Sequence, residues 1–510
     1  MNYKKGEFDK IMNTQEFSNV KRISEHELIR TEKMNKLRDL GIDPFGDKFI
    51  ASTHSKELIN NYSQYSRKAL LEKNITVSLA GRVMTKRGKG KAGFMHIQDV
   101  EGQIQVYVRA DQITQLEFEV YNQTDIGDII GIEGKVFKTQ TDELSVRVQT
   151  YKHLTKALKP LPDKFHGITD EDMKFRKRYL DIIMNKDVKE LFIKKQIFWS
   201  TVRNFLLEKG FLEVETPILE VSSGGAASKP FKTHHNALGI DVFLRISMGE
   251  LWQKKLLVAG FEKTFEIGRQ FRNEGMSNEH LQDYTQMEFY WAYADYSDGM
   301  EITKELYRKI TKALMGTSKF ISRGFEIDMD KEWEIYDFQE VIKENVGVDI
   351  YNTSLEDIKE KLESFDVIFD PDLGYWRLVD LLWKVVRKDL SGPGFLVGQP
   401  VQLNPLPKRL KEDPRKVAQM QIILAGSEMG NGYSELNDPL DLDERFNEQR
   451  MMSEAGDEEA HNHDEDFVEA LKYGMPPAFG FGFSERLFSM MMDKPIRECV
   501  IFPLMKPQNK

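Results

Sequence analysis

Cysteine is nearly absent from this sequence, because the 510 residues include only one, Cys499. A single cysteine excludes an intrachain disulfide, and no Cys/His cluster has the spacing of a structural zinc site. This composition is typical of proteins from a reducing compartment, so we expect a cytoplasmic location.

Long apolar runs and an excess of positive charge are missing as well. No run reaches about 18 apolar residues, and the first residues, MNYKKGEFDKIMNTQEF, lack the apolar core of a signal peptide. We therefore expect no membrane insertion. The 72 Lys and Arg are outnumbered by 82 Asp and Glu, for a net charge of -10, which argues against a generally basic nucleic-acid-binding surface. A local basic patch remains compatible with this balance.

The residue pattern changes along the chain and predicts a multidomain α+β protein. Residues 1–75 are polar, with one helical pattern, and form an N-terminal extension. Residues 76–155 contain five short alternating strands, with a helical stretch after the third, as in an OB-fold β-barrel. A linker rich in Pro and Lys is expected at 156–174. Residues 175–510 mix helices and strands, with a helical insertion around 319–410.

Two neighbouring stretches, TFEIGRQFRNEG and DYTQMEFYWAY, predict an antiparallel hairpin with one apolar and one polar face. The polar face carries Glu266, Arg272, Glu274, Tyr284, Glu288 and Tyr290. Buried charges need partners, so such a face is either a salt-bridge network or a ligand-binding surface. The residues by themselves leave both interpretations open.

A third polar strand face is predicted in GNGYSELND. In a strand, Asn431, Tyr433 and Glu435 share one surface, while the intervening residues face the other way. This surface combines an amide, a phenol and a carboxylate, and the residues alone leave its ligand open.

These stretches resemble the motifs of class II aminoacyl-tRNA synthetases. GFLEVETPIL is similar to motif 1, FRNEG to motif 2 and FGFGFSERLF to motif 3. With an OB-type domain in front, the order is that of class IIb, which contains the lysyl-, aspartyl- and asparaginyl-tRNA synthetases. Longer segments, including GGAASKPFKTHHNAL and MEFYWAYADY, resemble lysyl-tRNA synthetase in particular. The resemblance spans roughly residues 27–507 and is weakest between 319 and 410.

The resemblance implies a fold and a reaction. An OB-fold anticodon-binding β-barrel would precede a class II synthetase catalytic domain built on an antiparallel sheet flanked by helices. The protein would be a lysine–tRNA ligase, which uses ATP to convert L-lysine to lysyl-adenylate and transfers the lysyl group to the 3′ end of tRNA(Lys). A homodimer built through motif 1 is also implied. The apolar stripe of Ile193, Ile197, Phe198, Val202 and Phe205 is equally compatible with an internal core.

The side chain of the substrate lysine would be recognised by Glu435 and Tyr290, which by resemblance contact its ε-ammonium group. Tyr433 would line the aliphatic stem. An ammonium group offers three donors and one positive charge, so a shielded carboxylate is a suitable partner.

The opposite end of the lysine would be held by the remaining residues of the two polar faces. By resemblance, Glu250 and Glu288 bind the α-ammonium together with the backbone at Gly225. Arg272 and Asn431 bind the carboxylate.

The resemblance also implies the ATP contacts. Arg272 would contact the α-phosphate, Tyr284 and Arg486 would enclose the adenine, Glu274 would contact its amino group, and His280 would meet the distal phosphates. Catalysis would depend on Arg272 and Arg486 through positioning and charge neutralisation, without a side-chain nucleophile.

The implied cofactor is Mg²⁺, with Glu428 as a ligand. Gln421 stands where the family usually has a second acidic ligand, so it offers an oxygen but no charge. Three other departures are visible. In motif 3 the glycines of the family usually lie an odd number of residues before the arginine, whereas Gly480 and Gly482 lie an even number before Arg486. One residue more than in the family pattern precedes Glu250, and Glu279 occupies a position where a basic residue is common in the motif 2 loop.

In the predicted barrel, TKRGKGKAGF places four basic residues just before Phe94. A basic cluster beside an exposed aromatic ring can bind a phosphate and stack on a base. By resemblance, the anticodon would contact Arg82, Arg87, Phe94, Gln105 and Glu143. The alternative for Phe94 is a place in the barrel core.

Two other functions compete with this hypothesis. An aspartyl- or asparaginyl-tRNA synthetase would need cationic groups for its short polar substrate, whereas this pocket offers Glu435. A catalytically silent, synthetase-like RNA-binding protein is favoured by Gln421 and the altered motif 3. The presence of Arg272, Glu274, Glu428 and Arg486 argues against it.

Overall fold

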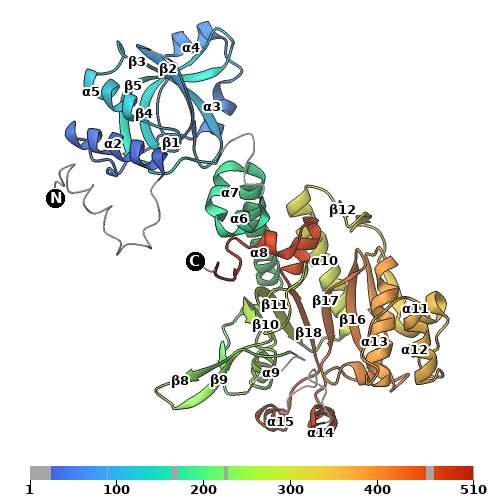
Figure 1. The fold of residues 1–510 in the computed structure, drawn as a ribbon. Coiled ribbons are helices and arrows are strands. Elements are labelled where there is room, and N and C mark those ends of the chain that lie inside the picture. Colours follow the sequence, from blue (N-terminus) through green and yellow to red (C-terminus); the bar gives the residue numbers. More distant parts are fainter. Residues whose placement is uncertain (1–23, 89, 163–169, 223–227, 455–463, 509–510) are drawn as a thin grey trace. The chain divides into compact units, whose positions relative to one another are not determined.

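The computed structural model describes residues 24–88, 90–162, 170–222, 228–454 and 464–508. The chain divides into two compact units, 1–169 and 170–510, which are described separately (Figure 1). Among the described residues, no helix has both the length and the apolar character needed to cross a membrane.

The first unit is a closed barrel with the strand order β1-β2-β3-β5-β4, which confirms the predicted OB-fold. Its strands are β1 (Thr76–Arg87), β2 (Ala92–Gln98), β3 (Gln103–Arg109), β4 (Ile129–Lys138) and β5 (Leu144–Thr155). Helix α5 (Gln115–Gln123) follows the third strand, as predicted, and begins with a capping box at Thr114 and Glu117. Helices α2 (Glu25–Asp39), α3 (Ser55–Tyr62) and α4 (Arg67–Lys73) precede the barrel.

The second unit is built on an eight-stranded sheet with the order β14-β15-β16-β17-β18-β11-β10-β6. Antiparallel pairing predominates, as predicted, but the outermost pairs at both edges are parallel. The strands are β6 (Leu212–Glu213), β10 (Lys263–Phe271), β11 (Asp283–Ala292), β14 (Glu334–Asp337), β15 (Gly394–Val397), β16 (Gln419–Leu424), β17 (Ser427–Ser434) and β18 (Ala478–Ser484).

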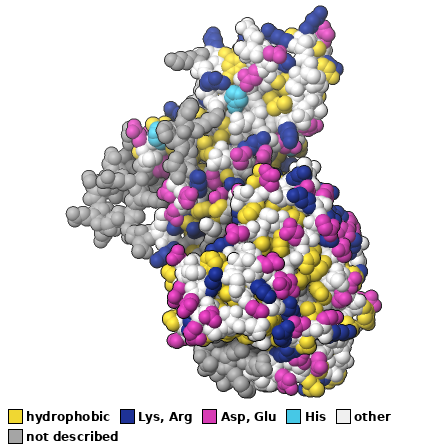
Figure 2. All heavy atoms as spheres, turned by 90° about the vertical axis from the view of Figure 1, so that its right-hand side faces the viewer, with side chains coloured by type: hydrophobic (Ala, Val, Ile, Leu, Met, Phe, Trp, Pro, Cys, Tyr) yellow, Lys and Arg dark blue, Asp and Glu magenta, His cyan; other side chains and the backbone are white. Residues whose placement is uncertain are grey.

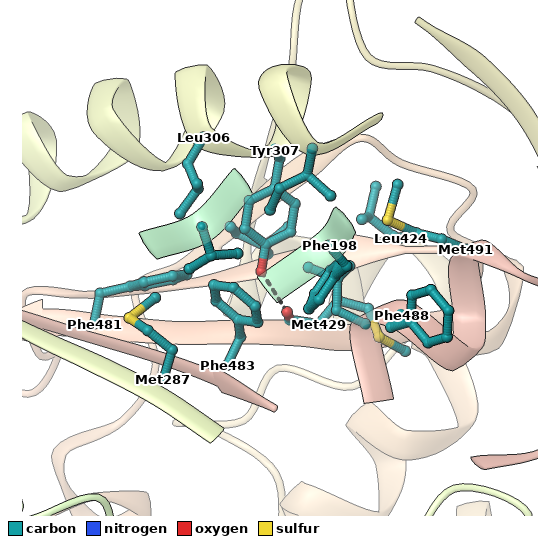
Figure 3. Close-up of a cluster of buried hydrophobic side chains, with 14 of the residues drawn as sticks. Phe198, Met287, Leu306, Tyr307, Leu424, Met429, Phe481, Phe483, Phe488 and Met491 are labelled. Carbon is teal, nitrogen blue, oxygen red and sulfur yellow. Dashed lines mark hydrogen bonds between the residues drawn. The ribbon is translucent and has the colours of Figure 1, made fainter. Parts of the chain in front are cut away.

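One face of this sheet is apolar and is covered by helices α8 (Lys186–Glu208) and α10 (Tyr296–Met315) and by α16 (Arg486–Met491) (Figure 3). Phe481 and Phe483 of β18 pack there against Phe198 of α8 and Tyr307 of α10. The Tyr307 hydroxyl donates to the Met429 carbonyl at 2.5 Å. This core fixes the sheet, so the residues that alternate with its apolar side chains face the opposite surface.

The remaining elements surround this framework. Helices α11 (Phe338–Val346), α12 (Leu355–Glu363) and α13 (Tyr375–Val386) form a second core against the β14 side of the sheet (Figure 1). The segment 319–410, predicted to be a helical insertion, contains the four strands β12 to β15 as well as helices. The other elements are α6 (Glu171–Arg176), α7 (Arg178–Met184), β7 (Leu219–Glu220), β8 (Lys232–His235), β9 (Ile240–Leu244), α9 (Glu250–Val258), β12 (Lys319–Ser322), β13 (Phe325–Asp328), η1 (Arg387–Asp389), η2 (Val401–Leu403), α14 (Pro439–Glu454), α15 (Glu465–Leu471) and η3 (Ile496–Cys499).

Two patterns behave differently in the structure. The residue pattern of FLEVETPIL predicts one strand, but the structure has two short ones, because β6 pairs with β10 and β7 pairs with β9. Between them lies Pro217, which has no N–H to donate to a sheet. The apolar stripe of α8 is largely internal. Phe198, Val202 and Phe205 are buried, whereas Ile193 is 49% exposed.

Charges of both signs are interspersed over the face of the second unit that Figure 2 shows. This distribution agrees with the net charge of -10 and with recognition through a defined site rather than a generally basic surface.

Candidate active site

The polar face of the sheet opens into a cavity of about 420 Å³. Its walls come from β11, β16, β17 and β18, from the start of α9 and from Arg272, which follows β10. Most of the predicted substrate residues line it: Glu250, Arg272, His280, Tyr284, Glu288, Tyr290, Gln421, Glu428, Asn431, Tyr433, Glu435 and Arg486. Residues separated by up to 236 positions in the chain thus share one cavity, since Glu250 and Arg486 both contribute to it.

Strand register explains how the polar faces combine. In the β10–β11 hairpin, Glu266 pairs with Glu288 and Gln270 pairs with Tyr284, which confirms the predicted polar face. Strand β18 lies between β11 and β17, so it separates Glu288 and Tyr290 from Asn431 and Tyr433. Paired residues of neighbouring strands point to the same side of a sheet. The polar side chains of β11 and β17 therefore lie on the same side, on either flank of β18.

Two glycines in β18 make room between these strands. Gly480 pairs with Tyr290 and Tyr433, and Gly482 pairs with Glu288 and Asn431. A Cβ atom on Gly480 would lie 2.2 Å from Glu435 Oε1, and one on Gly482 would lie 2.8 Å from Glu288 Cγ. The even spacing of these glycines before Arg486 thus places both on the cavity side, where any larger residue would displace a carboxylate.

Glu435 lies just beyond β17 and is 1% exposed. Burial raises the pKa of Glu435 to about 8, although the Lys254 ammonium, 2.7 Å from Oε2, opposes this shift. Among the described residues, Glu435 Oε1 has no hydrogen-bond donor, and Oε2 has only the ion pair with Lys254. A buried carboxylate oxygen without a donor at a cavity wall is suited to a cationic ligand.

Glu288 and Glu250 lie next to Glu435. Burial, together with the neighbouring Glu250 carboxylate, raises the pKa of Glu288 to about 7. Glu288 accepts from the Tyr290 hydroxyl at 3.0 Å and from the Met248 backbone N–H at 3.1 Å. The Tyr433 hydroxyl donates to Glu250 Oε1 at 2.6 Å. Each tyrosine hydroxyl therefore holds one carboxylate in place.

The residue just before Glu250 has a structural role. Gly249 is left-handed, with a φ of 63°, and immediately precedes α9. A Cβ atom there would lie 2.0 Å from Thr216 Oγ1. Glycine is favoured in this conformation, and the turn it makes joins the Met248 N–H, which binds Glu288, to the helix that carries Glu250.

Asn431 and Arg272 have polar groups directed by their neighbours. Gln419 Nε2 donates to Asn431 Oδ1 at 2.7 Å, which leaves the Asn431 amide nitrogen as a donor for a ligand. Arg272 Nε donates to the Ile246 carbonyl at 3.3 Å, and among the described residues no hydrogen bond occupies its two Nη groups, which can bind a ligand. Donors of this kind suit a carboxylate or a phosphate.

The far end of the cavity is rich in arginine. Arg486 forms an ion pair with Glu279, and Arg323 Nη2 lies 2.7 Å from the other oxygen of that carboxylate. Burial opposes ionisation, but these arginines lower the pKa of Glu279 below its usual value. His280 accepts from or donates to Ser277 Oγ at 2.8 Å, and burial followed by Arg486 lowers its pKa. An anionic ligand would meet these arginines, with Glu279 as their internal counter-ion.

Glu428 and Gln421 contribute oxygen atoms from β17 and β16. Trp383 Nε1 donates to Glu428 Oε1 at 2.6 Å, which orients the carboxylate. The described residues contain no group of three or more His, Cys, Asp or Glu side chains arranged to hold a metal ion. A metal bound here would therefore need further ligands from a substrate or from water.

One predicted residue among those described is not part of this lining. Glu274 is exposed, and its Oε1 accepts from Ser228 Oγ at 2.6 Å. Gly225 lies outside the described residues. The sequence hypothesis also missed Lys254, Gln419 and Arg323, which contact Glu435, Asn431 and Glu279. The i,i+4 spacing of Glu250 and Lys254 was a visible signal, but such a pair is usually solvent-exposed.

A second candidate site lies on the barrel wall formed by β2, β3 and β5. The half-buried Phe94 stacks on Tyr107 with ring centroids 4.4 Å apart, so it is not a core residue. Gln105 Nε2 donates to Glu143 Oε2 at 2.7 Å. Because Phe94 pairs with Tyr107 and with Arg87, these side chains share the outer face.

The other cations of this region differ in their availability. Arg82 Nη1 donates to the Gly127 carbonyl at 2.8 Å. Lys86 is turned toward the Tyr121 and Thr124 carbonyls, and burial lowers its pKa to about 8. Lys89 lies outside the described residues. Arg87 is thus better placed than Lys86 to meet a phosphate.

Comparison with known proteins gives matches across both units. A family model described as class II tRNA synthetases (D, K and N) matches residues 170–506, and a model of an OB-fold nucleic acid binding domain matches residues 77–154. A lysine–tRNA ligase from Staphylococcus saprophyticus is 45% identical over 484 residues, which are 94% of this chain and 98% of the relative. One from Bacillus subtilis is 44% identical over 497 residues, or 97% of this chain and 99% of the relative.

Proposed function

This chain belongs to the class II aminoacyl-tRNA synthetases and, within them, to the lysine–tRNA ligases, and from this premise we propose the roles of its side chains. Its reaction is the ATP-dependent ligation of lysine to tRNA. The observation that carries the assignment of the substrate pocket is the buried Glu435 Oε1, which lines the cavity without a donor among the described residues.

L-Lysine would extend along the groove over Gly480 and Gly482. Its ε-ammonium would bind Glu435 Oε1 beside Tyr290, with Tyr433 along the stem. Its α-ammonium would lie between Glu250 and Glu288. The carboxylate would meet Asn431 and Arg272, whose free N–H groups are donors. Gly225 would add a backbone contact.

ATP would occupy the arginine-rich end. Arg272 would bind the α-phosphate, Tyr284 and Arg486 would enclose the adenine, and His280 would meet the distal phosphates. Glu274 would reach the adenine amino group only after its hydrogen bond with the Ser228 hydroxyl is broken.

The lysine carboxylate oxygen attacks the α-phosphorus, and the bond to pyrophosphate breaks. A terminal ribose hydroxyl of tRNA then attacks the lysyl carbonyl, and AMP leaves. Arg272 stabilises the charge that grows on the phosphoryl oxygens.

The residues at the metal position fit Mg²⁺. Mg²⁺ is usually held by one or two protein oxygens together with phosphates and water. Glu428 would supply one charged ligand and Gln421 a neutral one. A bound Mg²⁺ would neutralise phosphate charge and orient the pyrophosphate leaving group.

Amino-acid-dependent exchange of labelled pyrophosphate into ATP tests the assignment. The full chain would be assayed with lysine, aspartate, asparagine and arginine separately, followed by charging of tRNA(Lys). We expect exchange with lysine only. Exchange with aspartate or asparagine would identify one of the related synthetases, and no exchange with any of the four would indicate a catalytically silent RNA-binding protein.

Lysine affinity should rise with pH. The folded-state pKa values of Glu288, about 7, and Glu435, about 8, lie above the ordinary carboxyl value, mainly because of burial. Both groups are therefore partly protonated in the free enzyme near pH 6.5, and two incoming ammonium groups favour their ionised forms. At pH values below the ordinary carboxyl pKa, protonated Glu288 and Glu435 make their full contribution to the free energy of unfolding. This contribution is lost as the pH rises through 7 to 8, unless lysine is bound.

Calorimetry of lysine binding in two buffers of different ionisation enthalpy would measure this linkage. At pH 6.5 we expect release of between one and two protons per lysine, and a Kd that falls by more than about tenfold per pH unit there and less steeply toward pH 8. Equal heats in both buffers and a flat Kd would contradict the pocket electrostatics.

The barrel would bind the tRNA anticodon through Phe94 and Tyr107, with hydrogen bonds from Gln105, Glu143, Arg82 and Arg87. Phe94→Ala should weaken tRNA(Lys) binding by about tenfold or more, since a stacked base contributes about 1–3 kcal/mol. Filter binding would measure this Kd, and pyrophosphate exchange should stay unchanged. Phe45→Ala is the control, because Phe45 is a 47% exposed phenylalanine outside this wall. An unchanged Kd for Phe94→Ala would remove the stacking role.

A homodimer fits the apolar surface that follows α8. Leu212, Ile218, Leu219 and Val221 are 46–72% exposed, and clustered exposed apolar side chains are typical of protein interfaces. Light scattering of the purified chain would give its mass and test this state.

The cytoplasmic location stays a prediction, which fractionation of cells would test.

A further inference from the structure

Lys254 is a buried cation beside the cavity, and the reaction as described above does not use it. It lies one turn after Glu250 in α9, and its side chain is 2% exposed. Its ammonium is 2.7 Å from Glu250 Oε1 and 2.7 Å from Glu435 Oε2. Both carboxylates line the cavity, whereas Lys254 lies behind them. It therefore supports the wall of the pocket without occupying the cavity.

Aromatic rings hold this ammonium in place. Its Nζ lies 5.8 Å from the ring centroid of Tyr290, 5.5 Å from that of Tyr433 and 5.8 Å from that of Phe467. Tyr290 and Tyr433 also line the cavity, and Phe467 belongs to α15. Rings favour a cation over their faces, and a long side chain with this surrounding has little freedom to leave the two carboxylates.

The charges around Glu435 show what Lys254 does. Glu250 comes from α9, Glu288 and Tyr290 come from β11, and Tyr433 comes from β17; β18 contributes only glycine at this point. Burial and the two neighbouring carboxylates raise the pKa of Glu435, and Lys254 is the cation that opposes them. Burial alone would lower the pKa of Lys254, but Glu250 and Glu435 raise it above its ordinary value, so the ammonium stays charged.

The number of charges also matches the ligand. Glu250, Glu288 and Glu435 would carry three negative charges when ionised, and Lys254 carries one positive charge. The difference, two negative charges, equals the two ammonium groups of L-lysine. In a pocket of low dielectric constant, a third uncompensated carboxylate would take up a proton instead.

We propose that Lys254 is a positioning residue for lysine recognition, which fixes Glu435 through Oε2 so that the charged Oε1 faces the ε-ammonium of the substrate. The inference rests on the proposed function, because it assumes that lysine is the ligand of this cavity. Glu435 Oε1 lies over Gly480, where the absent side chain leaves room for the oxygen.

Lys254→Gln tests the role, since it keeps a donor of similar length and removes the charge. Lysine KM, ATP KM and kcat would be measured by pyrophosphate exchange from pH 6 to pH 9. We expect the lysine KM at pH 7 to rise at least tenfold, and the pH at which it levels off to increase by about one unit. The ATP KM and the kcat at saturating lysine should change less than threefold.

Lys255→Gln is the matched control. Lys255 follows Lys254 in the same helix, pairs with Asp466 and lies over Trp252 rather than in the cavity wall. This variant should behave as the wild type does. Wild-type lysine KM and pH dependence in Lys254→Gln, or equal increases in the lysine and ATP KM values, would overturn the inference.

A further variant covers the case in which Lys254→Gln does not fold. Lys254→Arg keeps the positive charge but has a wider head group, so the lysine KM should rise while the pH dependence stays at the wild-type position. A shift of that dependence to higher pH in Lys254→Arg would overturn the inference. If the wild-type enzyme itself shows no lysine-dependent exchange, the proposed function fails, and the inference fails with it.

Discussion

Replacing Glu435 with glutamine is expected to lower kcat/KM for lysine by about 100-fold or more in pyrophosphate exchange. The side chain keeps its shape, but the ε-ammonium loses its only carboxylate partner at that end of the pocket. Loss of one member of a buried charge pair typically costs about 2–5 kcal/mol, which corresponds to roughly 30- to 5000-fold in affinity. The ATP KM should change little, because Glu435 lies at the opposite end from the arginines.

Folding should tolerate the same change. Burial raises the pKa of Glu435 to about 8, so the fold already favours the uncharged form at neutral pH, and a neutral amide adds little cost. Lys254 keeps its contact with Glu250. Thermal unfolding should therefore stay close to that of the wild type.

Glu301→Gln is a suitable control for Glu435→Gln, since Glu301 is 75% exposed and pairs with Lys304 on α10. The ratio of kcat/KM for lysine to that for norleucine gives an independent measurement. Norleucine has no ε-ammonium and leaves Glu435 unpaired, so the wild type should strongly prefer lysine, and this ratio should decrease greatly in Glu435→Gln. An unchanged kcat/KM for lysine would remove Glu435 from the substrate pocket.

Strand alternation was sufficient to predict which side chains share a face. It placed Glu288 and Tyr290 together, and Asn431 with Glu435, before any pairing was known. The alternation depends only on local backbone geometry, which is why it could be read from short segments. The barrel was predictable for the same reason.

Other features depend on how distant segments meet. The glycine spacing in β18 could be interpreted only through its register with β11 and β17, because Gly480 lies between Tyr290 and Tyr433. The i,i+4 pair of Glu250 and Lys254 is of a kind usually found exposed, but Glu435, which follows β17 far along the chain, pairs with the same ammonium in the buried cavity wall. Burial is set by the assembled fold, and a single sequence without an alignment does not encode it in any local pattern.

Substitution of Arg272 is the most direct test of the chemical step. Arg272→Lys keeps a positive charge but loses the fork of N–H groups, so one ammonium must replace two Nη donors. Loss of a donor to the charge that develops in a transition state typically lowers kcat by about 10²–10³. We expect a decrease of this size in pyrophosphate exchange and in single-turnover formation of lysyl-adenylate.

The comparison of kcat with KM separates two roles of this residue. Contact with the α-phosphate predicts that kcat falls, whereas a contact with the lysine carboxylate alone would raise the lysine KM and leave kcat nearly unchanged. Arg269→Lys is the control from β10, the strand that Arg272 follows. Arg269 pairs with Asp283 and is 40% exposed, and it is not part of the cavity lining. A kcat within threefold of wild type in Arg272→Lys would exclude the phosphate contact, and charge neutralisation would then have to come from Arg486 and its neighbours.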